Sequence, residues 1–244
     1  MSARRTVPET RVELYSPVGL IPTDSFTGAS PLGRLRVKLD LRDDGGRWRE
    51  TGIREVRTPG GVIAYPRLGR SREIAGSAPR IYRVRIESEF YLPHYTKTAG
   101  GTLDGIEFKA FPYNDTNPPA DYPKKPSQFP AYLKAVLKKV WLVPAPNYPF
   151  PAQVYVLRGV VVRAGGGGPV ADAEVNWGNK EKALSAANGT FGLPLRVSDI
   201  KHVTDPQKID ARDPRKNQQG KNEEGTINVV ISTDVGTNQT ITIS

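Results

Sequence analysis

Residues 154–195 constrain the fold more than any other stretch of this chain. Their sequence, VYVLRGVVVRAGGGGPVADAEVNWGNKEKALSAANGTFGLPL, has short apolar runs that are cut by glycine-rich turns. Short runs rich in β-branched and aromatic residues, bounded by turn residues, are typical of strands joined by hairpins. The stretch therefore predicts a small β-sandwich, and it does not have the pattern of an active site.

The composition of the whole chain indicates many short elements. Glycine (24) and proline (22) make up about a fifth of the 244 residues, above the average usage of about 12%. Residues 34–39 and 81–91 alternate between apolar and charged side chains, and a period of two is typical of strands with one buried face. We therefore expect an all-β fold.

Shifts in composition divide the chain into parts. We expect a polar N-terminal arm at residues 1–10, a first β-sandwich domain at 11–111, a proline-rich connector at 112–152 and a second β-sandwich domain at 153–244. Within the second domain, the charged stretch 199–225 is too long for an ordinary connection. We predict a loop there, either a functional arm or a disordered segment.

The connector is rich in prolines and also in aromatic residues. Because the aromatic residues are too many for a free linker, we expect the connector to be ordered. Residues 131–140 have an apolar helical face, whereas residues 140–143 are equally compatible with a strand. The aromatics either pack between the two domains or form a protein interface. They are Tyr113, Tyr122, Phe129, Tyr132, Trp141, Tyr148 and Phe150, of which we select Trp141, Tyr148 and Phe150 as partner-binding candidates.

Basic side chains share one face of each alternating stretch. If the two stretches form neighbouring strands, this face is a basic patch that binds a partner. The alternative is a solvated face with cross-strand ion pairs. The candidate residues of this patch are Arg34, Arg36, Lys38, Arg83 and Arg85.

The predicted charged loop supplies a second set of basic candidates, Arg212, Arg215 and Lys216. These residues either belong to an arm that docks on a neighbouring protein or lie in an ordinary loop. Acidic residues are interspersed with them, and the stretch has no aromatic residues, which argues against binding of single-stranded nucleic acid.

The sequence does not suggest a catalytic centre. The chain has no cysteine, which excludes disulfides, thiol nucleophiles and thiolate metal sites. Its two histidines, His94 and His202, are about 110 residues apart, and we expect each to be an exposed or turn histidine rather than a zinc ligand or triad member. Residues 165–168 lack the Lys-Ser/Thr of a phosphate loop and predict a hairpin turn. We expect no enzymatic activity, no cofactor and no metal.

Three motifs in residues 156–195 resemble the carboxypeptidase regulatory-like family. They are GVV at 159–161, PVADAEV at 169–175 and NGTFGL at 188–193, where Asn188 occupies a position at which the family often has Asp. The resemblance covers about 40 residues. It implies a transthyretin-like, seven-stranded sandwich that serves as an attachment module without catalytic residues.

The first domain is similar to this family at the level of pattern alone. In both parts a proline-led strand is followed by a loop and a glycine-opened apolar strand. The expected architecture is therefore two transthyretin-like or Ig-like β-sandwich domains joined by the Pro-rich connector.

The N-terminal residues contain arginines but no apolar segment after them, so we expect no Sec signal peptide and a protein that is cytoplasmic when made. No window approaches 18 apolar residues, so we expect no membrane insertion. Small β-sandwich proteins without export signals are typical of phage tails and of phage-tail-like contractile injection systems, by analogy of fold.

We therefore expect a structural or adaptor protein of such a particle, in its baseplate, cap, spike or fibre adaptor, with other protein subunits as partners. The alternative is a carbohydrate- or cell-surface-binding module. The net charge of +10 reflects either solubility or an anionic partner. We expect neither nucleic acid nor a small-molecule substrate as the ligand.

Overall fold

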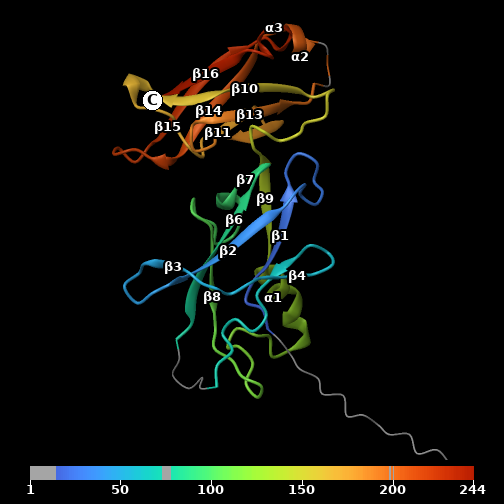
Figure 1. The fold of residues 1–244 in the computed structure, drawn as a ribbon, viewed down its shortest axis with the longest axis vertical. Helices are drawn as coiled ribbons and strands as arrows, with labels where there is room; N and C mark the ends of the chain where they lie inside the picture. The colour runs from blue at the N-terminus through green and yellow to red at the C-terminus, as the bar shows by residue number, and fades with distance from the viewer. Residues whose placement is uncertain (1–14, 73–77, 198, 200) are drawn as a thin grey trace, which may run out of the picture. The chain divides into compact units, whose positions relative to one another are not determined.

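The computed structural model describes residues 15–72, 78–197, 199 and 201–244 (Figure 1). Most of its regular structure is β-strand, which confirms the all-β fold class. The predicted N-terminal arm at residues 1–10 lies outside the described residues.

Most elements are short, as the content of glycine and proline predicts. The first strands are β1 (Gly19–Asp24), β2 (Leu35–Arg42), β3 (Trp48–Glu50), β4 (Val56–Arg57), β5 (Ile63–Ala64), β6 (Arg80–Ser88), β7 (Tyr91–Pro93), β8 (Ile106–Ala110) and β9 (Leu137–Pro144). The later strands are β10 (Tyr155–Arg163), β11 (Glu174–Trp177), β12 (Glu181–Leu184), β13 (Thr190–Leu195), β14 (Gln207–Lys216), β15 (Asn222–Val229) and β16 (Asn238–Ile243). The helical segments are η1 (Tyr95–Lys97), η2 (Pro126–Gln128), α1 (Phe129–Val136), η3 (Ala164–Gly166), α2 (Lys201–Thr204) and α3 (Ile231–Asp234).

The chain divides into two compact units, each assembled from separate segments. Unit 1 comprises the described residues of Met1–Ile21, Lys38–Val84 and Glu107–Lys138. Unit 2 comprises the described residues of Pro22–Val37, Arg85–Ile106 and Lys139–Ser244.

In unit 2, the strands from β10 to β16 form two sheets, coloured yellow to red in Figure 1. One sheet has the order β13-β10-β16 and the other the order β12-β11-β14-β15. β10 pairs antiparallel with β13 and parallel with β16, so that Gly159 lies opposite both Phe191 and Gln239. The other sheet is antiparallel at every pair of strands.

These two sheets share one apolar core, which makes this part of the chain a β-sandwich. Apolar residues at alternate positions of the strands point inward, and burial of each large side chain contributes about 1.5–3 kcal/mol. The buried core residues are Leu157, Val161, Val170, Ala173, Val175, Trp177, Ala183, Phe191, Leu193, Leu195, Ile209, Ala211, Val229, Ile231, Ile241 and Ile243.

The NGTF motif forms the turn that leads into β13. The Asn188 side-chain oxygen accepts hydrogen bonds from the Thr190 amide (3.2 Å) and the Thr190 hydroxyl (2.7 Å). Gly189 has a φ of 77°, and a Cβ at this position would lie 2.7 Å from the carbonyl oxygen of Val161. Only glycine meets both conditions without strain, which explains why the motif has glycine at this position.

Residues 165–168 form the predicted turn after β10. The Arg163 amide donates a hydrogen bond to the carbonyl oxygen of Gly168 over 3.0 Å. Three of the four glycines have a positive φ. The element that follows this turn is the strand β11 rather than the helix that a phosphate loop leads into.

The prediction of a charged loop at 199–225 was wrong. This stretch contains β14 and the first part of β15, which pair antiparallel as a hairpin with a register shift between Arg212 and Lys216. Ile209 and Ala211 face the core, and they alternate with the charged side chains of Lys208, Asp210 and Arg212. The many charges hid this alternation in the sequence.

The hairpin also meets the last strand. The amide of Glu224 donates to the carbonyl of Ser244 over 3.3 Å, and the amide of Ser244 donates to the carbonyl of Glu224 over 3.2 Å. A Cβ on Gly225 would lie 2.1 Å from the Thr242 carbonyl oxygen, so this close approach requires glycine. These contacts cover part of the β15 edge, which reduces its capacity to pair with a strand of another chain.

Two further sheets have the orders β4-β5-β1-β9-β7 and β3-β2-β6-β8. β2 and β6 are neighbours, which is the condition that the basic-patch hypothesis required. The predicted connector contains both a helix and a strand, since α1 ends at Val136 and Leu137 adopts an extended conformation (φ −81°, ψ 116°) that begins β9. The helix is therefore shorter than the predicted 131–140.

Candidate docking surfaces

An aromatic groove lies in unit 1, beside helix α1. It has a volume of about 720 Å³, within the range of typical ligand sites, which is about 300–1,000 Å³. Its lining includes the aromatic residues Phe108, Phe111, Tyr122 and Tyr132 and the prolines Pro17 and Pro123. We call it the aromatic groove from here on.

Tyr122 is the centre of the ring cluster at this groove. Its ring makes edge-to-face contacts with Tyr15 (4.6 Å between centroids), Phe129 (5.4 Å) and Tyr132 (5.5 Å). Such geometry is favourable because the positive edge of one ring meets the negative face of another. The cluster holds Tyr122 and Tyr132 in place as walls of the groove.

The segment before the helix is held in position by polar contacts. The Asn114 side-chain oxygen accepts hydrogen bonds from the amides of Thr116 (3.1 Å) and Asn117 (2.9 Å). The Gln128 side-chain oxygen accepts from the amides of Lys124 (3.1 Å) and Lys125 (3.2 Å) just upstream of α1. These contacts hold the proline-rich segment in place as a wall of the groove.

Charged groups surround the aromatic rings. Lys109, Lys124 and Lys138 line the groove together with one carboxylate, that of Asp121. Burial lowers the pKa of Lys138, because a desolvated ammonium ion is less stable than one in water. Burial, and then the nearby Asp121 charge, raises the pKa of Tyr132 to about 12. The groove therefore combines an apolar floor with a net positive charge.

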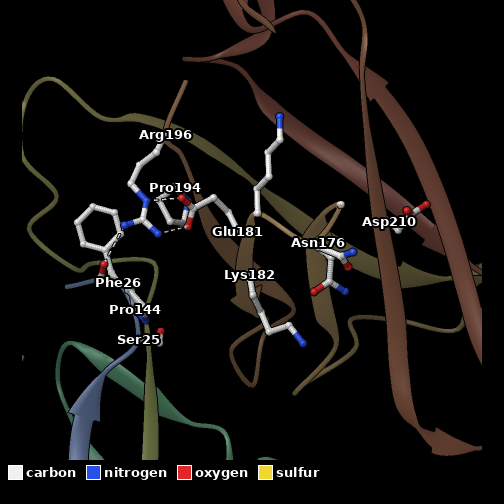
Figure 2. A pocket seen from close by; sticks show the side chains of 12 residues that line it. Ser25, Phe26, Pro144, Asn176, Glu181, Lys182, Pro194, Arg196 and Asp210 are labelled. Carbon is white, nitrogen blue, oxygen red and sulfur yellow. Dashed lines mark hydrogen bonds and ion pairs between the residues drawn. The ribbon is translucent and has the colours of Figure 1, made fainter. Parts of the chain in front are cut away.

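A second cavity, of about 560 Å³, lies in unit 2 and is mainly polar (Figure 2). Arg196 lies at one side, where it binds both carboxylate oxygens of Glu181 and donates to the Phe26 carbonyl oxygen over 3.1 Å. Its guanidinium carbon also lies 5.0 Å from the centroid of the Phe26 ring. We call this group the Arg196 clasp; each of the three guanidinium nitrogens donates one hydrogen bond, and the bond to the Phe26 carbonyl positions the backbone there.

Other residues that line this cavity are cross-strand neighbours on the outer face of the sheet that contains β11. Asn176 of β11 lies between Lys182 of β12 and Asp210 of β14, and Figure 2 shows all three beside the cavity. Asp210 accepts a hydrogen bond from the Thr226 hydroxyl over 2.7 Å, which lowers the pKa of its carboxyl group. Such a row of polar side chains suits hydrogen bonding to a polar ligand.

Asp24 forms a buried polar network with two tyrosines in unit 2. Its carboxylate accepts hydrogen bonds from the hydroxyls of Tyr148 (2.8 Å) and Tyr91 (3.1 Å) and from the Phe26 amide (2.8 Å). Burial, followed by the hydrogen bond to Asp24, raises the pKa of Tyr148. The Tyr91 hydroxyl in turn accepts from the Leu32 amide over 2.9 Å. The network fixes residues 24–32.

His94 is buried rather than exposed, which corrects the expectation from the sequence. Its Nε2 atom lies 2.7 Å from Glu174, whose other oxygen accepts from Lys182 over 2.9 Å. The hydrogen bond from His94 is the main cause that lowers the pKa of Glu174 to about 2. His202 makes an edge contact with Trp177, with 5.7 Å between centroids.

The predicted basic patch is partly neutralised. Arg34 and Arg36 are exposed, Lys38 and Arg85 are half-buried, and Arg83 donates to the buried Asp40 over 2.9 Å and 3.1 Å. Arg83 also lies 4.6 Å from the centroid of the Trp48 ring. For Arg83, this arrangement matches the alternative of cross-strand ion pairs.

The predicted aromatic candidates have different environments. Tyr148 is buried and belongs to the Asp24 network, and the Phe150 ring packs 4.7 Å from it. Trp141 is half-buried, with the Lys139 ammonium 3.9 Å from its ring centroid. Tyr148 is thus unavailable to a partner without unfolding.

The basic residues of the hairpin are also paired within unit 2. Arg215 bridges the carboxylates of Asp172 (2.7 Å) and Asp213 (3.4 Å). The buried Asp213 also contacts Arg163. Arg212 donates to the Asn222 side-chain oxygen over 2.7 Å, whereas Lys216 is exposed at the end of β14. The predicted docking arm is a hairpin whose charges are mostly satisfied.

Sequence reasoning missed the Arg196 clasp, the Asp24 network and the lysines of the aromatic groove. The connector aromatics were the one signal in the sequence that pointed to the groove. Within residues 15–72, 78–197, 199 and 201–244, no group of three His, Asp or Glu side chains could hold a metal ion. None of the helices that the structure describes is long and apolar enough to cross a membrane.

Comparisons with known proteins do not define a family. No family model matches the chain, and no curated protein matches it. Among solved structures the chain is similar to the Bacillus anthracis TIE protein, at 9% identity and a TM-score of 0.27, over 95% of this chain and 33% of that one. The chain thus spans about a third of that protein's length, and a TM-score this low does not establish a shared fold.

Proposed function

We propose that this chain is a non-enzymatic structural or adaptor protein that docks on other protein subunits within a larger assembly. The observation that supports this most is the aromatic groove of unit 1. Aromatic residues are enriched at protein interfaces because they bury much area with few rotatable bonds.

Exposed apolar side chains near the groove support the same proposal. Leu133 on helix α1 and Leu137 at the start of β9 are 49% and 40% exposed, and each is next in sequence to a residue that lines the groove. Exposed apolar residues are typical of interaction sites where they form a patch with a polar rim. They support a docking surface that includes α1 and the groove.

We further propose that the assembly is a phage-tail-like contractile injection particle and that the chain is a baseplate, cap, spike or fibre-adaptor component. The resemblance of residues 156–195 to the carboxypeptidase regulatory-like family supports an attachment role. The three-plus-four arrangement of the strands from β10 to β16 supports that resemblance. The step from fold to particle is an analogy between folds.

A carbohydrate- or cell-surface-binding module is the second candidate. The polar cavity of unit 2 supports it, because Asn176, Lys182 and Asp210 present donors and acceptors on one sheet face. A saccharide requires such side chains together with an aromatic surface. The nearby Phe26 ring already has Arg196 beside it, which makes this candidate the weaker one.

Cofractionation separates the two candidates. Lysate from the cells that make the protein is separated by size-exclusion chromatography with light scattering, and the chain is detected with an antibody. We expect comigration with a multi-megadalton particle that resists high salt. A monomer in both lysate and purified sample would contradict the assembly role, and a glycan-array signal lost on Asn176→Ala would then favour the second candidate.

A further inference from the structure

The lysines of the aromatic groove lack anionic partners. No ion pair joins Lys109, Lys124 or Lys138 to a carboxylate in the part of the chain that the structure describes. Asp121 contributes the only acidic side chain among the described residues that line the groove. Three ammonium groups against one carboxylate leave an excess of positive charge.

Several arginines outside the groove, in contrast, form ion pairs within the chain. Arg83 is paired with Asp40, Arg163 with Asp213 and Glu223, and Arg196 with Glu181. Within these groups each cation already has its anion, so an incoming acidic ligand gains little there. The unpaired lysines make the groove a better site for an anionic group.

Of the three lysines, Lys138 should contribute most to the binding of an anionic group. The Lys138 side chain is half-buried and forms no ion pair with a carboxylate among the described residues, so its charge is partly desolvated without a compensating anion. A ligand carboxylate beside it would restore the lost interaction in a site with less water, where ion pairs are stronger than at the open surface.

The apolar lining of the groove indicates which backbone conformation a bound peptide would have. Tyr122 and Tyr132 form a ridge of rings, with Pro123 and Pro17 beside them. Proline-containing segments in the polyproline II conformation dock on aromatic-lined grooves and lose little entropy, because they are already extended. The lysines that line this groove favour a segment that also carries acidic residues.

We propose that the aromatic groove binds an extended, acidic, proline-containing segment of a neighbouring protein subunit. The prolines pack on the rings of Tyr122 and Tyr132, and the ligand carboxylates pair with Lys109, Lys124 and Lys138. This inference rests on the proposed docking function and names the class of partner that the groove takes.

The test uses a fluorescein-labelled peptide in which Glu-Pro-Leu-Pro is repeated three times, titrated with the full-length protein in fluorescence anisotropy. We expect saturable binding that weakens as salt rises, since the contribution of exposed charges is screened. Matched peptides replace Glu by Lys, or Pro by Gly, and both should bind at least tenfold more weakly.

Variants of the protein locate the site. Each of Lys109→Gln, Lys124→Gln and Lys138→Gln should weaken binding about two- to fivefold, and the triple variant by tenfold or more. The matched control is the double variant Lys97→Gln and Lys221→Gln, which removes two exposed charges from unit 2 and should leave affinity unchanged. Far-ultraviolet circular dichroism checks that every variant is folded.

Several outcomes would overturn the proposal. These are no binding of the acidic peptide, equal binding of its Lys or Gly counterparts, or the same affinity in the triple variant. Binding of maltoheptaose or of a duplex DNA at the groove, abolished by the triple variant, would assign a different ligand class. Particle comigration that persists without peptide binding would refute this inference alone and leave the docking function intact.

Discussion

Replacement of Asp24 by alanine should destabilise unit 2 strongly. The carboxylate is fully buried and accepts hydrogen bonds from the hydroxyls of Tyr91 and Tyr148 and from the amide of Phe26. Alanine leaves these donors without an acceptor, and each buried unsatisfied group costs about 1–3 kcal/mol. We expect the free energy of unfolding to fall by about 3–5 kcal/mol.

A double-mutant cycle assigns this loss to the network. Tyr148→Phe alone should cost about 1 kcal/mol, since it removes one hydroxyl but leaves Asp24 with its other donors. In the Asp24→Ala background the same change should cost nothing or even stabilise the protein, because it removes a buried hydroxyl that no longer has its acceptor; the coupling is then about 1–2 kcal/mol. Urea denaturation followed by tryptophan fluorescence measures all four proteins.

The conservative variant Asp24→Asn is the control, because its side-chain oxygen still accepts hydrogen bonds. It should lose about half as much stability as the alanine variant, given that hydrogen bonds to charged acceptors are roughly twice as strong as neutral ones. A loss below about 1 kcal/mol for Asp24→Ala, or strictly additive effects in the cycle, would refute the role assigned to this network.

Three further changes test other parts of the structure. Glu174 has a pKa of about 2 in the folded protein against an ordinary 4.5. Its carboxylate should therefore stabilise the fold by up to about 3 kcal/mol above pH 4.5, and this contribution should be lost as the pH falls toward 2. Urea titrations at a series of pH values measure this loss, which Glu174→Gln should abolish. Gly189→Ala should cost about 2–4 kcal/mol in thermal unfolding, whereas Gly178→Ala, also at positive φ but in open space, should cost only about 1 kcal/mol, and equal losses would contradict the steric argument. Arg163→Gln should cost about 2–3 kcal/mol because Asp213 is buried, and a neutral effect in urea denaturation would show that Arg215 alone satisfies it.

Some of the fold could be predicted because its signals are local. The NGTF turn depends on Asn188 and Gly189, which are adjacent in the chain, and the strand that follows it, β13, is mostly apolar. The hairpin of β14 and β15 was missed because most of its residues are polar or charged and only the inward positions, such as Ile209 and Ala211, show the period of two.

The contacts that define the candidate sites could not be predicted from the sequence, because they join residues that are far apart in the chain. Asp24 finds its partners 67 and 124 residues away, and His94 meets Glu174 80 residues away. Periodicity and turn chemistry report neighbours within a few residues and give no information on which distant side chains meet. The excess of aromatics in residues 112–152 did indicate a ring cluster, but not that lysines would surround it.

The groove makes the central claim directly testable by site-specific photocrosslinking. p-Benzoylphenylalanine replaces Tyr132 in the groove or, as a control, Tyr155, an exposed aromatic residue of unit 2. The variants are produced in the native cells, irradiated, and the crosslinked partner is identified by mass spectrometry. We predict a crosslink from position 132 to an acidic, proline-containing segment of a subunit of the same particle, and none to that segment from position 155. No crosslink from position 132, or the same crosslink from both positions, would contradict the account.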